Sequence, residues 1–387
     1  MNLLYLDWPS FGGRQMMQAF SDLGYGVVRF FHKDFKLDSS EDFLNAAEEA
    51  CKGKQLDFCF SLNYFPIMAV FCHNRGLKYI SLVYDSPLVN LFSYTVSFDT
   101  NEIFVFDSET VDMFRSEGLT NFKYMCLPSN LVPTEPYRPS NTFVKKDYRC
   151  DISFVGSLYN EDHNFLDRLK GLSPKTSGYI DGLIGAQSLI YGHNYIEECL
   201  TDDVIEEIQK EVKYTPAFGG IESLSYVFSE YFINRKLTSK ERIEMLTAIA
   251  KKYRLTLYSF PESNIIENAK FMGVADYYTD MPCIFRDSKI NLNISLRSIK
   301  SGIPLRCIDI MACGGFLLTN YQSDMFRHFV AGEDFDYFES KEDLMNKIAY
   351  YLEHDTERRT IAKSGQEKVR RLHSCEACIK DMIKIVF

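Results

Sequence analysis

The sequence lacks the features of several large protein classes. Its 387 residues include 43 Lys and Arg against 53 Asp and Glu, and the net charge of −10 comes without a basic run. Nucleic-acid-binding proteins need a basic surface, so the composition argues against a nucleic-acid partner. The 11 cysteines are scattered, and the nearest two, Cys375 and Cys378, are three positions apart with no second pair to complete a zinc pattern, so no zinc site and no other metal site is predicted.

Targeting segments are also missing. The N-terminal stretch MNLLYLDWPSFGG has no basic residues before its short apolar run, so we expect no signal peptide. No apolar run approaches the roughly 18 residues of a membrane-spanning helix. With unpaired cysteines, these absences predict a cytoplasmic protein. Apolar residues make up 46% of the chain, which is enough to bury full cores, and the length predicts two or three domains.

The first third of the chain alternates short apolar strands with helices, which predicts a parallel sheet with crossover helices. It opens with a strand at residues 3–7, a loop containing Gly12 and Gly13, and a helix at 14–23. This opening is Rossmann-like, although the full G-x-G-x-x-G fingerprint is absent. The Gly12-Gly13 pair either borders a ligand or only forms a tight turn.

Asp85 follows the predicted strand 79–84 within the sequence Asp85-Ser86-Pro87. Open α/β sheets bind ligands at the carboxyl ends of their strands, so this carboxylate is a candidate functional group. The alternative is an ordinary turn or helix-capping aspartate.

A second unit follows a proline-rich segment, residues 129–150, that reads as an interdomain linker. Another Rossmann-like opening comes next, with a strand at 151–155 that ends on Gly156 and Ser157. Residues 160–250 are expected to form a helical insertion before the sheet resumes. Helical spacing within this insertion predicts helices at Asn164–Leu172, Gly182–Ile190, Asn194–Cys199, Asp203–Val212 and Ser239–Tyr253.

The most informative stretch is residues 289–321, which predicts a strand, a loop, the helix Leu305–Cys313 and a second strand. The fixed φ of Pro304 suits a first helical turn, and Gly314 suits a left-handed helix end. Free amides at a helix N-terminus bind anions, and a diphosphate would fit here. The loop adds two cations and small residues, which are Arg297, Lys300, Ser301 and Gly302.

Arg306 and Asp309 are three residues apart and therefore share one face of that helix. An acid at this position, just beyond an anion site, could accept hydrogen bonds from a ribose. The alternative is a buried helix that carries an Arg–Asp surface pair.

The chain resembles a known family over nearly its whole length. The segment SKINLNISLRSIKSGIPLRCIDIMACGGFLLTNY and the helices that follow it look like the C-terminal half of a family-1-type glycosyltransferase. The segments YMCLPSN, DISFVGSLYN and RKLTSKERIEMLTAIAKKYRLTLYS resemble the CgeB-like members. The resemblance implies a GT-B fold, that is, two facing Rossmann-like domains with a helical insertion in the second.

In such proteins the C-terminal domain holds a nucleotide-sugar donor and the N-terminal domain holds the acceptor. The resemblance assigns residues 1–145 and the terminal helix 375–387 to the first domain and residues 150–372 to the second. It implies an enzyme that needs no metal and no cofactor, because a helix N-terminus and cations offset the charge of the leaving diphosphate. UDP is expected as the donor nucleotide more than GDP, with a hexosyl or N-acetylhexosaminyl group as the sugar.

The family motif places the ribose-binding acid at Asp309, where most relatives carry Glu. Many relatives have another Glu eight residues earlier, where this chain has Ser301. The remaining donor-site candidates are Arg297, Lys300, Arg306, Gly302, Gly156, Ser157 and Tyr277, whose backbone would face the base. Gly12 and Gly13 would border the cleft from the acceptor side.

An inverting reaction needs a base for the acceptor hydroxyl, and Asp85 is the candidate. A retaining reaction would not need this base, and the sequence does not choose between the two. The expected acceptor is a cell-surface glycan or a protein such as flagellin, and the insertion could support a homodimer. Two alternatives stay open, a nucleotide-sugar epimerase and an inactive protein that only binds a nucleotide sugar or a glycan.

Overall fold

The computed structural model describes residues 1–131, 147–161, 164–217 and 219–387. The predicted linker at 129–150 falls mostly outside these ranges. Contacts divide the chain into two compact units. Unit 1 comprises Met1–Asn130, Tyr214–Ser223 and His373–Phe387, and unit 2 comprises Leu131–Lys213 and Leu224–Leu372. Across the described ranges, no helix combines the length and apolar character needed to cross a membrane.

Unit 1 is built on six parallel strands in the order β2-β1-β3-β4-β5-β6. The strands are β1 (Asn2–Leu6), β2 (Gly26–Phe30), β3 (Phe58–Leu62), β4 (Lys78–Val83), β5 (Asn101–Val105) and β6 (Phe122–Tyr124). All residues of β3 and β5 are buried, as expected for central strands covered by helices on both faces. This doubly wound order places its switch point, where ligands usually bind, between β1 and β3.

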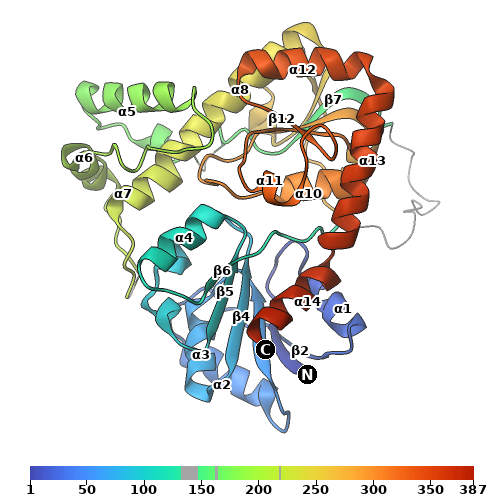
Figure 1. The fold of residues 1–387 in the computed structure, drawn as a ribbon. Coiled ribbons are helices and arrows are strands. Elements are labelled where there is room, and N and C mark those ends of the chain that lie inside the picture. Colours follow the sequence, from blue (N-terminus) through green and yellow to red (C-terminus); the bar gives the residue numbers. More distant parts are fainter. Residues whose placement is uncertain (132–146, 162–163, 218) are drawn as a thin grey trace. The chain divides into compact units, whose positions relative to one another are not determined.

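The helices of unit 1 include one from the far end of the sequence. They are α1 (Gly13–Asp22), α2 (Glu41–Cys51), α3 (Pro66–Arg75), α4 (Ser108–Ser116) and α14 (Cys375–Val386), with 3-10 turns at Val89–Phe92 and Tyr94–Ser97. Figure 1 shows α14 beside α1, so both chain termini lie in this unit. The side chain of Ser40 caps α2 by accepting a hydrogen bond from the Phe43 amide at 3.1 Å.

A short segment of the predicted insertion also belongs to unit 1. This segment, Tyr214–Ser223, meets the residue between the two 3-10 turns of unit 1 through an antiparallel bridge between Ser93 and Gly220. The Ile221 amide donates to the Phe92 carbonyl at 2.9 Å. The chain therefore leaves unit 2 after Lys213, completes unit 1, and returns at Leu224.

Unit 2 is built on a second sheet of six parallel strands, in the order β12-β11-β10-β7-β8-β9. The strands are β7 (Cys150–Val155), β8 (Leu255–Tyr258), β9 (Lys270–Phe271), β10 (Ser288–Asn293), β11 (Leu317–Asn320) and β12 (Asp336–Phe338). This is the Rossmann order, whose switch point lies between β7 and β10. The loops that leave these two strands are therefore the expected ligand-binding loops.

Most helices of unit 2 flank this sheet (Figure 1). They are α5 (Pro174–Gln187), α6 (Asp202–Val212), α7 (Leu224–Val227), α8 (Asn234–Lys252), α9 (Met281–Asp287), α10 (Leu305–Ala312), α11 (Met325–His328), α12 (Lys341–Glu353) and α13 (Asp355–Leu372), with 3-10 turns at Leu166–Arg168 and Pro261–Ser263. A π-helical turn, Phe228–Ile233, joins α7 to α8. Such turns often accompany functional sites.

Two predicted helices of the insertion are wrong. Residues 164–172 form only a 3-10 turn, Leu166–Arg168, and residues 194–199 form turns. The side chain of Asn194 explains the second failure, because its Oδ1 accepts from the Ile196 amide at 3.0 Å and its Nδ2 donates to the Arg297 carbonyl at 2.9 Å. An asparagine used in this way competes with helix formation. Pro304 also differs slightly, since it lies at the N-cap of α10 rather than in its first turn.

Candidate functional site

The loop that leaves β10 at the switch point of unit 2 is fixed before any ligand arrives. Side chains of other elements satisfy its backbone: Asn320 accepts from the Ser295 amide at 2.7 Å, and Thr238 accepts from the Arg297 amide at 2.9 Å. Gln322 donates to the Gly302 carbonyl at 3.0 Å. Such a loop loses little further conformational freedom when it binds a ligand.

Helix α10 begins where this loop ends. Its N-cap residue is Pro304, which has no side-chain acceptor and therefore leaves the first-turn amides without the usual N-cap hydrogen bond. Helix ends of this kind favour an anion. The helix stops at Gly314, with φ of 81°, and a Cβ at Gly315 would lie 2.6 Å from the Phe285 carbonyl oxygen. The two glycines thus let the chain turn tightly into β11 and keep α10 against the sheet.

Two predicted donor-site residues meet inside unit 2. The hydroxyl of Tyr277 donates to Oδ2 of Asp309 at 2.8 Å, and the Asp309 carboxylate is only 1% exposed. A buried carboxylate needs such donors because burial penalises its charge. The family resemblance predicts that the Tyr277 backbone faces the nucleobase of the donor. The hydrogen bond to Asp309 instead uses the Tyr277 side chain.

Arg306 is half-buried on α10 and makes no ion pair among the described residues, so the alternative of an Arg306–Asp309 surface pair fails. Its Nη1 lies 2.7 Å from the Met281 sulfur, and its guanidinium lies 5.5 Å from the centre of the Phe285 ring. These contacts hold the side chain but do not neutralise its charge.

The other two predicted cations have acidic partners. Arg297 is buried and donates from Nε to Oε2 of Glu241 at 2.8 Å, from Nη2 to Oε1, and from Nη1 to the Ile190 carbonyl at 3.0 Å. Nζ of Lys300 lies 3.9 Å from carboxylate oxygens of both Glu197 and Glu230. Burial raises the pKa of Glu230 to about 7, although the Lys300 charge acts against this.

Gly302 and Ser301 lie buried at the end of the same loop. Oγ of Ser301 donates to Oδ2 of Asp324 at 3.1 Å, and the Asp324 amide donates back to the Ser301 carbonyl at 3.1 Å. The position where many relatives carry Glu is therefore occupied here by a serine that contacts an aspartate.

Gly156 and Ser157 leave the end of β7, on the other side of the switch point. Oγ of Ser157 donates to the carboxylate of Glu161 at 2.6 and 2.7 Å and accepts from the Tyr159 amide at 2.7 Å. The Ser157 carbonyl accepts from Arg242 of α8 at 2.6 Å. Arg242 was not among the predicted site residues, because nothing in the helical pattern of α8 indicates that its side chain reaches these loops.

In unit 1, Asp85 follows the carboxyl end of β4, as its position in the sequence predicts. Asn63, which follows β3 and has φ of 59°, donates from Nδ2 to Oδ2 of Asp85 at 2.6 Å. Its Oδ1 accepts from the Asp85 amide at 3.2 Å. Burial raises the pKa of Asp85, and the hydrogen bond from Asn63 offsets part of that rise.

Gly12 and Gly13 begin α1 at the same edge of this sheet. Gly12 has φ of 81°, and a Cβ there would lie 2.2 Å from the Asn130 side chain, so only glycine fits. The Gly13 carbonyl accepts from the Tyr5 hydroxyl at 2.9 Å. Trp8, which sequence analysis did not single out, stacks on Tyr84 with ring centres 6.2 Å apart.

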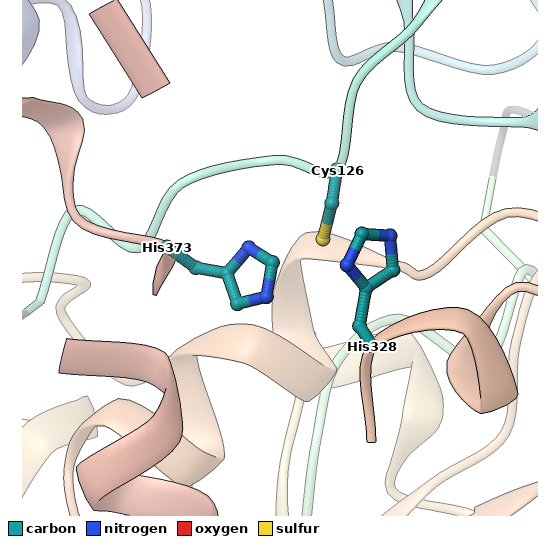
Figure 2. Close-up of side chains that lie close together, drawn as sticks. All are labelled: Cys126, His328 and His373. Carbon is teal, nitrogen blue, oxygen red and sulfur yellow. The ribbon is translucent and has the colours of Figure 1, made fainter. Parts of the chain in front are cut away.

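Unit 1 also contains a buried cysteine and histidine close together. Figure 2 shows Cys126 and His373, whose potential ligand atoms lie within 4.8 Å of each other, and it also labels His328, which belongs to unit 2. Two ligands are fewer than the four of a structural zinc site. This pair alone does not provide a metal site within the described part of unit 1.

Three comparisons relate the chain to known proteins. Residues 240–384 match the family described as "Glycosyl transferase-like". No curated protein sequence matches. Over its whole length, the chain is similar in structure to sucrose-phosphate synthase from Thermosynechococcus elongatus, with a TM-score of 0.53, 11% identity and 98% of that chain covered.

Two more solved structures have similar scores. HepE of Anabaena, in complex with UDP and glucose, has a TM-score of 0.54 and 10% identity, with 100% of this chain and 99% of that chain covered. A glycosyltransferase from Rickettsia africae has a TM-score of 0.53 and 10% identity, with 99% and 97% covered. At these identities the structural likeness establishes the fold. The chain has the GT-B fold, and its residues 240–384 are similar to the glycosyl transferase-like family.

Proposed function

We propose that this protein is a metal-independent glycosyltransferase that moves a hexosyl or N-acetylhexosaminyl group from a UDP-linked donor. The acceptor would be a cell-surface glycan or a surface protein such as flagellin. The observation that carries the proposal is the start of α10 in unit 2. There, uncapped helix amides follow a fixed loop, with the buried Asp309 and the unpaired charge of Arg306 on the same helix.

Each part of this arrangement suits one part of a nucleotide-sugar donor. The first-turn amides of α10 would hold the diphosphate, and Arg306 would offset the charge that grows on it as the sugar leaves. Asp309 would accept hydrogen bonds from the ribose, with Tyr277 holding the carboxylate in place. A UDP donor is preferred because HepE, which shares the fold, was solved with UDP and glucose.

Asp85 of unit 1 would act as the base for an inverting reaction. Its raised pKa favours proton uptake, and the hydrogen bond from Asn63 fixes the orientation of the carboxylate. In a retaining reaction, Asp85 would only bind the acceptor. Measuring the anomeric configuration of the product separates the two mechanisms.

The second candidate is a protein that binds the donor without turnover. The observation that favours it is Ser301, which stands where many relatives have an acid and is committed to a hydrogen bond with Asp324. A binder would release no free nucleotide from any donor, whereas a transferase would hydrolyse its donor slowly even without an acceptor.

The test is thermal stabilisation by UDP, GDP, TDP and CMP sugars in the presence of EDTA, followed by nucleotide release. We expect a selective shift with a UDP sugar, because a ligand that binds only the folded state raises its stability. Asp309→Asn should lose the shift. Asp181→Asn, at an exposed position of α5, is the matched control and should keep it. The absence of a shift with every nucleotide would refute the proposal.

A further inference from the structure

A buried acidic side chain, Glu230, lies in the π-helical turn Phe228–Ile233 of unit 2 and is only 2% exposed. Its Oε2 accepts a hydrogen bond from Nδ2 of Asn234 at 3.1 Å. Its Oε1 lies 3.9 Å from Nζ of Lys300, which is beyond hydrogen-bond distance. A carboxylate with so few close donors is costly to bury in its charged form. The geometry therefore favours a protonated Glu230 up to near neutral pH, in line with its pKa of about 7.

The charged groups that face Glu230 are one base and one acid. Lys300 comes from the loop before α10, and Glu197 comes from the turns of the insertion. Nζ of Lys300 lies 3.9 Å from a carboxylate oxygen of each acid. Burial has the largest effect on the Glu230 pKa and raises it, the Lys300 charge lowers it, and the Glu197 charge raises it. The position of the ammonium between the two acids therefore depends on whether Glu230 is charged.

Hydrogen bonds connect the surroundings of Glu230 to the loop before α10. Oγ of Ser298, a residue of this loop, donates to the Glu230 carbonyl at 2.8 Å. Oδ1 of Asn234 accepts from Nδ2 of Asn194 at 2.9 Å, and the same Nδ2 donates to the Arg297 carbonyl at 2.9 Å. A change at the Glu230 carboxylate therefore reaches two neighbouring residues of the loop.

The side-chain amide of Asn234 determines which oxygen of Glu230 takes up a proton. Because this amide donates to Oε2, the proton belongs on Oε1, the oxygen that faces Lys300. An ammonium group has donors and no acceptor. Lys300 is therefore attracted to the ionised carboxylate and gains no hydrogen bond from the protonated one.

We infer that Glu230 is a positioning residue that controls the loop before α10 through Lys300, according to its own protonation. Ionised Glu230 draws the ammonium towards itself and adds a negative charge next to the loop. Protonated Glu230 leaves the ammonium to Glu197 and removes that negative charge, which favours the binding of an anionic donor. The inference rests on the proposed function and adds to it a regulation of donor binding by pH.

The experiment measures UDP-glucose affinity between about pH 5.5 and 8.5 for the wild-type protein and Glu230→Gln. UDP-glucose is used because it lacks the terminal phosphate of UDP, which itself titrates near about pH 6. Wild-type affinity should fall by about threefold to tenfold as pH rises and Glu230 ionises. Glu230→Gln, which has nearly the same size and no charge, should keep the affinity that the wild type has in acid.

Glu197→Gln is the matched control. Glu197 lies as far from Lys300 as Glu230 does, but its side chain is 29% exposed instead of 3%. Its replacement should leave the fall in affinity with pH in place. An equal fall in the wild type and Glu230→Gln would overturn the inference. Loss of the fall in Glu197→Gln would also overturn it, because Glu197 would then be the group that titrates.

A second measurement needs no ligand and also serves if Glu230→Gln does not fold. In the wild type, the decrease of Tm that Glu230 causes should end near about pH 7. Without Lys300 the ionised form loses its cation, so in Lys300→Met this decrease should extend to higher pH. If the wild type binds no nucleotide sugar, the proposed function fails. An unchanged end point in a protein that binds UDP-glucose would contradict the inference alone.

Discussion

Arg297→Met tests whether Arg297 is a diphosphate contact or a structural anchor. The guanidinium and Glu241 form a buried ion pair whose side chains are 9% and 3% exposed. Removing one partner leaves the other charge buried, which typically costs about 3–5 kcal/mol. Burial raises the pKa of Glu241, and Arg297 opposes this rise, so without Arg297 we expect the pKa of Glu241 to rise further.

The sign of the pH effect follows from this shift. In the folded variant Glu241 would hold its proton to a higher pH than in the unfolded chain. Stability would therefore decrease as pH rises, and the loss caused by Arg297→Met should be smallest in acid. Urea denaturation at several pH values measures this. Arg359→Met is the control, because its ion pair with Asp355 is exposed and is worth about 0–1 kcal/mol.

The double variant Arg297→Met/Glu241→Leu decides between the two roles. Replacing both members of a buried pair with apolar side chains is often neutral, so we expect stability to return. If Arg297 is an anchor, UDP affinity should return as well, to within about twofold of the wild type. A stable double variant whose UDP affinity is reduced by about tenfold would show that Arg297 contacts the phosphates. A cost below about 1 kcal/mol for Arg297→Met would refute the buried-pair argument.

Three further predictions concern single residues. Asp85→Asn should abolish transfer yet raise stability at neutral pH, because burial disfavours the charged form that the substitution removes; turnover and urea denaturation check both. Wild-type stability should decrease between about pH 5 and 7 as Glu230 ionises, since its folded pKa is raised to about 7; Glu230→Gln should remove that slope in a plot of Tm against pH. Tyr277→Phe should destabilise the protein by about 1–3 kcal/mol, because the buried Asp309 loses a donor; an unchanged denaturation midpoint would contradict the contact.

The sequence predicted the sheets well because parallel strands produce continuous apolar runs between glycine-marked turns. The strand β10 lies at the start of the stretch 289–321, where a strand was predicted first, and the helix α10 ends one residue before its predicted end at Cys313. The insertion was predicted less well because its structure depends on distant contacts. Asn194, for example, donates hydrogen bonds to the Asn234 side chain and to the Arg297 carbonyl. The pattern of apolar residues along the chain does not indicate either partner.

Only part of the candidate site could be predicted from the sequence, because the rest also depends on contacts between residues that are distant in the chain. The motif around α10 is local in sequence, so Asp309, Arg306 and Gly302 could be named in advance. Asn63, which orients Asp85, follows a different strand, and its left-handed φ has no unique sequence signature. The hydroxyl of Tyr277 meets Asp309 across 32 positions of the chain, so their pairing needed the fold.

The basic residues near α10 differ in whether an acidic side chain lies close to their charge, and this difference says more about their role than their position in the sequence does. Arg297 and Lys300 come from the loop nearest α10, yet both have acidic neighbours within the unit. Arg306 comes from α10 itself, and among the described residues it has no acid within 4.0 Å and contacts the Met281 sulfur and the Phe285 ring instead. In the proposed function, a diphosphate at the start of α10 would supply the negative charge that Arg306 lacks. Basic residues that already have an acidic partner hold the loop in shape. We expect the diphosphate to contact a basic residue that has no such partner.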